Sequence, residues 1–249
     1  MSEPKHKGER IAKRIARAGL CSRRDAERWI AAGRVQVNGR ILDTPACVVG
    51  PEDTVVVDGR PLPDDAGTRL FLYHKPAGLV TTHKDERGRK TVFEALPADL
   101  PRVVSVGRLD LNTEGLLLLT NDGGLSRFLE LPATGWSRQY RVRVMGAVDS
   151  ARLDDLKKGI EVDGVRYKSI TAKLEQEQKS ANAWLSVTLR EGKNREIRRV
   201  MEALDLKVSR LIRIAYGPFQ LGKLAAGAVQ EVKLDVLRAQ IPHYFKDKS

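Results

Sequence analysis

The sequence predicts an α+β protein with two unequal domains: a small N-terminal domain, and a larger one built on a mixed, largely antiparallel β-sheet with flanking helices. Three observations support this prediction. Helical apolar spacing near the N-terminus gives way to hairpin patterns, a segment of linker composition follows at residues 61–67, and strand patterns with a few helices fill the rest. With 249 residues and 41% hydrophobic content, the chain can bury a core.

The helices of the N-terminal domain are predicted by apolar spacing and by a capping pattern. Residues 1–8 are polar and charged, and we expect them to form a mobile basic tail. In residues 11–18 apolar side chains recur at helical spacing before a glycine ends the pattern. Ser22, with Asp25 three residues later, has the arrangement of a capping box and predicts a second helix over 23–32.

A small sheet is expected to follow these helices. The segment 35–42 alternates apolar and polar residues around Asn38-Gly39, a pair that favours a tight β-hairpin turn. A short strand over 54–57 completes a domain that we place at residues 9–60. Residues 61–67, rich in proline and aspartate, are predicted to be the linker to the larger domain.

The larger domain is predicted to span residues 68–242, followed by a polar C-terminal tail at 243–249. Helices are expected over 149–158 and over 195–204, the second capped by Asn194. Strand patterns dominate the remainder, at residues 69–73, 103–106, 116–120, 140–145, 170–174, 183–190, 208–214 and 229–234, with a further hairpin signal at 162–165. Strands with few intervening helices favour an α+β arrangement rather than a doubly wound sheet.

The charge balance indicates a polyanionic partner. The chain has 44 Lys+Arg against 32 Asp+Glu, a net charge of +12, which favours nucleic acid. An anionic membrane is the alternative, but no apolar run approaches the roughly 20 residues of a spanning helix, and no signal segment opens the chain. We therefore expect a cytoplasmic monomer that does not contact a membrane.

The sequence gives no support for a metal or a nucleotide cofactor. Cys21 and Cys47 are too few and too far apart for a metal-binding cluster, and the histidines lack ligand spacing. Neither a Walker-type phosphate loop nor a Gly-x-Gly-x-x-Gly turn is present. Any chemistry is expected to use side chains alone, without a cofactor.

The segment Gly107-Arg108-Leu109-Asp110-Leu111-Asn112-Thr113-Glu114-Gly115 is the first candidate for an active-site loop. It holds an arginine and a carboxylate two residues apart, directly before the apolar run 116–119. Asp110 is the first candidate catalyst. The same residue types also cap ordinary surface turns, so the spacing alone fits both interpretations.

Two further side chains could act together with Asp110. Arg198 lies at the border of the apolar stripe of its helix, where its guanidinium could pair with a partly desolvated carboxylate and keep it ionised. An ordinary charged helix start would have the same pattern. Tyr140 opens an alternating strand, where it could stack on a nucleobase or simply pack across strands.

The N-terminal domain closely resembles the S-four-type RNA-binding domain. The segments that carry this resemblance are 11–27, with Arg23 and Arg24 at the start of the second helix, and 30–39, with Arg34 before the first strand. Basic residues alone would fit a solvated surface equally well. The resemblance implies that Arg23, Arg24 and Arg34 contact RNA phosphates, and such contacts position a protein rather than specify a sequence.

The larger domain resembles the pseudouridine synthases of the RsuA branch. The matching segments cover nearly all of residues 69–240; they are 73–78, 107–123, 140–142, 191–199 and 209–217. The segment 194–199 and the attached N-terminal domain are most similar to members that act on large-subunit ribosomal RNA. The family's usual Lys-x-Tyr motif has Arg138 in place of its lysine, which keeps the charge.

This resemblance implies a role for each candidate. Asp110 would be the catalytic carboxylate, Arg198 its ion-pair partner, Tyr140 the aromatic that packs against the target uracil, and Arg108 the side chain that fills the gap left by the extruded base. The target must be flipped or already unpaired, because a stacked base cannot be reached. An ionised Asp110 could attack ribose carbon-1, attack the uracil ring or assist loss of a ribose proton, and Tyr140 could help to remove the carbon-5 proton.

Two other functions fit parts of the sequence. A catalytically silent RNA-binding or ribosome-assembly factor would keep the same fold and differ in having no use for Asp110. A helix-turn-helix DNA regulator could be built on residues 9–33 but would leave the larger domain without a task. The pattern as a whole favours an RNA pseudouridine synthase.

Overall fold

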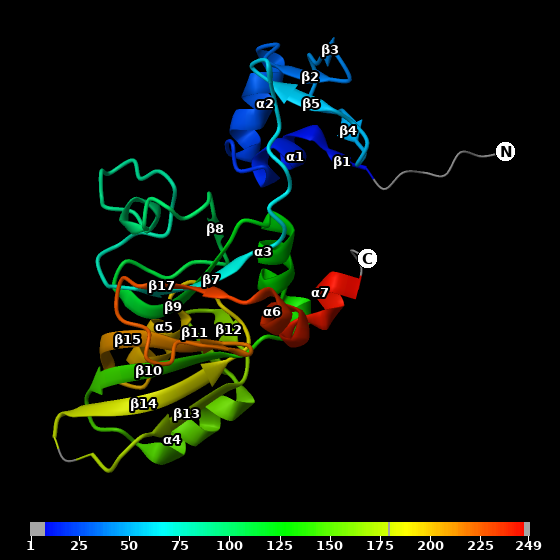
Figure 1. Ribbon diagram of the computed structural model, residues 1–249. Coiled ribbons are helices and arrows are strands. Elements are labelled where there is room, and N and C mark those ends of the chain that lie inside the picture. The colour runs from blue at the N-terminus through cyan, green and yellow to red at the C-terminus, as the bar shows by residue number, and fades with distance from the viewer. Residues whose placement is uncertain (1–7, 179, 247–249) are drawn as a thin grey trace. The chain divides into compact units, whose positions relative to one another are not determined.

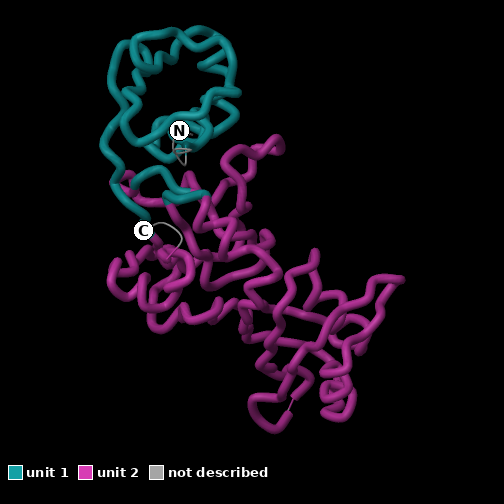
Figure 2. Tube along the Cα trace, turned by 90° about the vertical axis from the view of Figure 1, so that its right-hand side faces the viewer, with its two compact units in different colours: residues 1–69, 101–103, 121–123 teal, residues 70–100, 104–120, 124–249 magenta. Residues whose placement is uncertain are grey.

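The computed structural model describes residues 8–178 and 180–246. Its internal contacts divide the chain into two units (Figure 2). The first unit comprises the chain up to residue 69 together with 101–103 and 121–123, and the second comprises the remainder. No helix in the described ranges is long and apolar enough to cross a membrane.

Two helices and short strands form the first unit. Helices α1 (Ile11–Arg17) and α2 (Arg23–Ala31) pack their apolar sides into one core. The capping box predicted for α2 is confirmed, since the Ser22 hydroxyl accepts from the Asp25 amide at 3.1 Å and the Ser22 amide donates back to the Asp25 carboxylate at 3.4 Å. The backbone amides of Ser22 and Asp25, which have no partner within the helix, are satisfied in this way.

The strands of the first unit form two small sheets. The predicted hairpin is confirmed, with Asn38 and Gly39 at φ of 50° and 79°, as a tight hairpin turn requires. The larger sheet has the order β3-β2-β5-β6, and β1 pairs with β4. The strand bounds are β1 (Glu9–Arg10), β2 (Val35–Val37), β3 (Arg40–Ile41), β4 (Val48–Val49), β5 (Val55–Val57) and β6 (Arg60–Pro61).

The second unit is built on one mixed sheet with the strand order β13-β14-β10-β15-β9-β7-β17 (Figure 1). Among its described strands only β9 and β15 pair in parallel, so the predicted mixed, largely antiparallel sheet is confirmed. The strands are β7 (Leu70–Lys75), β8 (Val104–Ser105), β9 (Thr113–Thr120), β10 (Arg138–Met145), β13 (Ile170–Leu174), β14 (Asn182–Leu189), β15 (Lys207–Tyr216), β16 (Phe219–Gln220) and β17 (Val229–Val232). Strands β11 (Ile160–Val162) and β12 (Val165–Tyr167) form the predicted second hairpin.

Helices cover the sheet in two groups. Helices α4 (Ser150–Asp155) and α5 (Glu196–Ala203) pack with β10, β13 and β14 around one core, whereas α3 (Gly123–Glu130), α6 (Leu234–Gln240) and α7 (Pro242–Lys246) lie together around another (Figure 1). Short 3₁₀ turns occupy η1 (Phe93–Ala95), η2 (Pro132–Thr134) and η3 (Leu156–Lys158). The apolar sides of β10 and β14 alternate with exposed polar residues, as a half-buried strand requires.

Two sequence expectations about helix ends were wrong, and two helices were missed. Asn194 does not cap the helix near residue 195; α5 begins at Glu196, and Arg195 occupies the N-cap with a left-handed φ of 52°. The polar tail expected from residue 243 is wrong for 243–246, because these residues continue α7 and bury Tyr244 against the core. Helices α3 and α6 were not predicted. The tail at 1–8 lies outside the described residues except for Gly8.

The contact between β9 and β15 depends on one glycine. Gly115 has a φ of 100° and lies opposite Arg213 in the parallel register. A Cβ at this position would lie 2.2 Å from the Arg213 carbonyl oxygen and 2.7 Å from its amide nitrogen. Only glycine lets the two backbones approach this closely. This contact joins the strand that follows the Asp110 loop to the strand beside Tyr140.

Candidate active site

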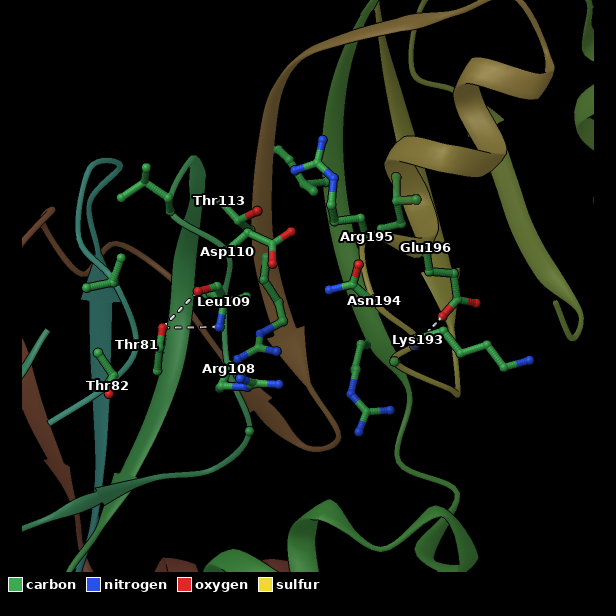
Figure 3. Close-up of a pocket in the computed structure, with 18 of the residues that line it drawn as sticks. Thr81, Thr82, Arg108, Leu109, Asp110, Thr113, Lys193, Asn194, Arg195 and Glu196 are labelled. Carbon is green, nitrogen blue, oxygen red and sulfur yellow. Dashed lines mark hydrogen bonds between the residues drawn. The ribbon is translucent and has the colours of Figure 1, made fainter. Parts of the chain in front are cut away.

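A cavity of about 740 Å³ in the second unit is lined by residues from four of the segments that carry the resemblance. It includes the candidates Arg108, Asp110 and Tyr140, whereas Arg198 is not among its lining residues. Its walls come from the loop 80–89, the loop 107–113, strands β10 and β15, and the segment 192–197 before and within α5. Asp110 lies on one side of the cavity and faces Asn194 and Arg195 on the other side (Figure 3).

The backbone of the Asp110 loop is fixed by local hydrogen bonds. The Thr113 amide donates to the Asp110 carbonyl at 3.0 Å, which closes the turn. The Thr81 hydroxyl accepts from the Leu109 amide at 3.3 Å and donates to the Leu109 carbonyl at 2.8 Å (Figure 3). The Asp110 side chain is half-buried. The loop therefore holds this carboxylate at the cavity wall without using the carboxylate itself as a structural cap.

Lys75, at the end of β7, is the main buried polar residue that the sequence reasoning missed. Its side chain is fully buried, and its ammonium donates to the carbonyl oxygens of four residues at 2.9–3.3 Å, namely Pro76, Asp110, Leu111 and Thr113. Burial lowers the pKa of Lys75 to about 8, against the opposing effect of Asp110 and Glu114. Strand alternation could have revealed it, since Lys75 continues the inward positions of Phe71 and Tyr73.

Arg198 lies near the Asp110 loop, and its side chain contacts a backbone carbonyl of that loop rather than the Asp110 carboxylate. Within the described residues the expected ion pair with Asp110 is not formed; the Arg198 guanidinium instead donates to the carbonyls of Asn112 at 3.1 Å and Val208 at 3.3 Å. Burial lowers the pKa of Arg198, and the Asp110 charge acts in the opposite direction. The physical reason is geometric: Arg198 reaches the end of the turn, two residues beyond the carboxylate.

Tyr140 and Arg108 occupy contrasting positions. Tyr140 is 8% exposed, lies in β10 opposite Val187 and Arg213, and adds an aromatic surface to the cavity wall. Arg108 is exposed at the cavity. An arrangement of one half-buried carboxylate, one aromatic ring and several arginines can hold a planar, polar base next to an ionised acid.

The arginines predicted to contact RNA phosphates lie in the first unit, and all are exposed. Arg23 and Arg24 form the first turn of α2. Arg34 makes a bidentate pair with Asp58, with Nε to Oδ1 at 2.8 Å, and its guanidinium lies 4.7 Å from the Trp29 ring centroid. Asp58 therefore already balances the charge of Arg34.

A buried carboxyl group, Glu196, shapes the wall opposite Asp110. Glu196 is 4% exposed; its Oε2 accepts from the Lys193 amide at 2.9 Å, and its Oε1 has no partner within the described residues. Burial and, to a smaller extent, the nearby Glu191 carboxylate raise the pKa of Glu196 to about 7, against the lowering effect of the hydrogen bond from the Lys193 amide. In the sequence, Glu196 lies in the same charged segment as Arg198, where an ordinary helix start would give the same pattern.

The raised pKa of Glu196 predicts a loss of stability with rising pH. Between the usual value near 4.5 and about 7 the folded state binds more protons than the unfolded state, so stability falls as pH rises through this window and is constant above it. In Glu196→Gln this component is absent. Thermal unfolding from pH 4 to 8 should show the wild type losing melting temperature relative to the variant, and parallel curves would contradict the prediction.

The comparisons with known proteins agree with this geometry. The family model described as RNA pseudouridylate synthase matches residues 69–203, and the S4 domain model matches residues 9–55. The chain belongs to the RNA pseudouridylate synthase family. Its resemblance to this family and to the S4 domain is thereby confirmed, and the chain is an RNA pseudouridine synthase with an N-terminal S4 domain.

Several pseudouridine synthases are similar over most of their length. A protein of Rickettsia felis named uncharacterized RNA pseudouridine synthase is 49% identical, over 92% of this chain and 99% of that protein. Ribosomal large subunit pseudouridine synthase B of Haemophilus influenzae is 42% identical, over 94% of this chain and 67% of that protein. A solved pseudouridylate synthase structure superposes with a TM-score of 0.64 at 25% identity, over 91% of this chain and 96% of that one.

Proposed function

We propose that this protein isomerises a specific uridine of ribosomal RNA, with large-subunit RNA as the favoured substrate. The observation that carries the proposal is the cavity in which Asp110, Tyr140 and Arg108 meet in a pseudouridine synthase domain. The net charge of +12 supports an RNA partner. The name of the Haemophilus influenzae relative supports the large-subunit substrate.

The reaction defines what the cavity has to supply. The bond between uracil nitrogen-1 and ribose carbon-1 breaks, the uracil turns, ring carbon-5 bonds to the ribose, and the carbon-5 proton leaves while nitrogen-1 gains one. Asp110, as a carboxylate, attacks ribose carbon-1, attacks the uracil ring or assists loss of a ribose proton. Each route needs an ionised acid beside a base that has left its stack.

The other residues take supporting roles. Tyr140 packs against the flipped uracil and is positioned to help remove the carbon-5 proton, and Arg108 fills the gap that the base leaves. Arg198 acts as a positioning residue, because its hydrogen bond to the Asn112 carbonyl ties α5 to the Asp110 loop. No cofactor has a role in this scheme.

The S4 domain supplies additional RNA binding. Arg23 and Arg24 are exposed on the first turn of α2, and Arg34 is exposed directly before β2. All three are proposed to contact RNA phosphates. We place the RNA-binding domain at residues 9–60 and the catalytic domain at 68–242, joined by the linker 61–67. The enzyme is proposed to act as a cytoplasmic monomer.

Mapping pseudouridines in ribosomal RNA tests the proposal. Cells that lack this chain should lose pseudouridine at one site of large-subunit RNA and regain it when the wild-type chain is restored. An unchanged map of both ribosomal RNAs would reject the proposal. Loss of a pseudouridine from small-subunit RNA instead would support the proposed activity but show that the substrate is small-subunit RNA.

A further inference from the structure

Two arginines in the cavity, Arg138 and Arg213, lie against the ring of one buried tyrosine. The Cζ atoms of Arg138 and Arg213 are 4.8 Å and 5.2 Å from the ring centroid of Tyr216. Tyr216 is 2% exposed, and its hydroxyl donates to the Leu129 carbonyl at 2.8 Å. All three side chains line the cavity that also contains Asp110.

Hydrogen bonds to neutral groups hold both guanidiniums in place. Arg138 donates to the carbonyls of Arg190 and Glu191 at 3.0 Å and 3.3 Å, and to the Tyr216 hydroxyl at 3.0 Å. Arg213 donates from Nε to the Leu116 carbonyl at 2.7 Å. A planar guanidinium fixed at one edge and stacked on a ring keeps a defined direction for its remaining donors.

The positive charges of this pair lack a partner in the described part of the chain. Neither guanidinium lies within ion-pair distance of a carboxylate, although Arg213 is only 3% exposed and its Nη2 has no hydrogen-bond partner there. The carboxyl groups of the cavity belong to Asp85, Glu86, Asp110, Glu130 and Glu196, and within the described residues none of them forms an ion pair with Arg138 or Arg213. Asp85 pairs with Arg89, and Glu130 accepts from the Ser126 hydroxyl at 2.7 Å. A buried, uncompensated cation is unfavourable unless a ligand supplies the opposite charge.

We propose that Arg138 and Arg213 form a phosphate-binding site for the RNA backbone at the target nucleotide. This inference rests on the proposed function. A uracil carbonyl would satisfy a donor but would leave both charges unbalanced, whereas each phosphodiester of RNA carries one negative charge and accepts two parallel hydrogen bonds from a guanidinium. Tyr216 acts as a positioning residue that keeps both guanidiniums directed at this phosphate.

The site lies beside the catalytic loop because of the sheet register. Arg213 is opposite Gly115 in β9 and opposite Tyr140 in β10, so the backbone that carries Arg213 contacts the strand after the Asp110 loop and the strand with the proposed uracil-packing residue. A phosphate held here would fix the ribose of the target nucleotide relative to Asp110. Binding energy from the backbone would then orient the reacting centre.

A thermodynamic cycle between one arginine and one phosphate tests the proposal. A transcript of large-subunit ribosomal RNA is first treated with the wild-type enzyme to find the converted uridine, and hairpins around it are synthesised with single neutral methylphosphonates at each flanking position. One methylphosphonate should weaken wild-type binding by about tenfold, and Arg213→Gln should weaken binding of the unmodified hairpin by a similar factor. The same methylphosphonate should then weaken binding by Arg213→Gln by less than about twofold, because the contact is already lost.

Arg143→Gln is the matched control. Arg143 is an exposed arginine of the same strand as Arg138, and it points to the face opposite Tyr140. This variant should keep the full sensitivity to the methylphosphonate. Because Arg213 is buried, thermal unfolding is measured for each variant to confirm that it folds. If Arg213→Gln does not fold, the same binding measurements are made with Arg138→Gln, since Arg138 is only half-buried.

The two possible failures are distinguishable. Suppose that the wild type converts the uridine, but that at every flanking position the methylphosphonate weakens binding by the arginine variant as much as it weakens binding by the wild type. The two arginines then do not bind a phosphate, and the inference is wrong. If the wild type converts no uridine in either ribosomal RNA, the proposed function fails and the inference falls with it.

Discussion

Replacing Asp110 by asparagine is expected to lower pseudouridine formation by at least about 10³-fold while RNA binding stays within about twofold of wild type. Asparagine has nearly the same shape but is neutral, so it cannot act as a nucleophile or base in any of the three routes. The loop should keep its conformation, because the Lys75 ammonium and the Thr113 amide both bind the backbone carbonyl of residue 110.

Conversion of a ribosomal RNA transcript and binding of the same RNA at matched salt are the two measurements. Asp163→Asn is a suitable control, since Asp163 is an exposed turn residue with a left-handed φ of 51° that asparagine tolerates. Unchanged conversion by Asp110→Asn would remove this residue from its proposed role. That result would favour a different catalyst or, together with an unchanged cellular map, an RNA-binding factor without activity.

Gly115→Ala is expected to cause the largest loss of stability, more than about 4 kcal/mol. The added methyl group would lie 2.2 Å from the Arg213 carbonyl oxygen, and it cannot move away because backbone on both strands is fixed by the sheet. The contact between β9 and β15 would have to open. Since that contact joins the Asp110 loop to the Arg213 and Tyr140 side of the cavity, activity should fall as well.

Gly164→Ala separates the steric effect from the backbone effect. Gly164 also has a positive φ, 72°, but a Cβ there would meet no atom within 4 Å. Its substitution should lower stability by only about 1 kcal/mol, the usual cost of a left-handed alanine. Denaturant unfolding of both variants measures the difference, and equal losses would show that the sheet relieves the clash at Gly115.

The candidate site was predictable to the extent that it lies within short motifs. Asp110 and Arg108 stand out in one Gly-bounded loop, and Tyr140 opens an alternating strand; the structure brings all three to one cavity, while their roles stay predictions. Arg198 is half-buried, as its border position on the helix predicts. The partner predicted for it is wrong, because its guanidinium reaches the Asn112 carbonyl and not the Asp110 carboxylate. Helical periodicity gives the direction of a side chain and not the atom that it reaches.

The sequence by itself determined the elements whose signals are local. The capping box at Ser22, the hairpins at Asn38-Gly39 and Asp163-Gly164 and the alternating strands arise from contacts between near neighbours, and the motif order is enough to identify the family. The tertiary structure alone decided the parallel contact at Gly115, the hydrogen bonds from Lys75 to the Asp110 loop and the placement of Arg138 and Arg213 against the Tyr216 ring. These features join residues far apart in the chain, and their energies depend on burial and on backbone approach, which local patterns do not encode.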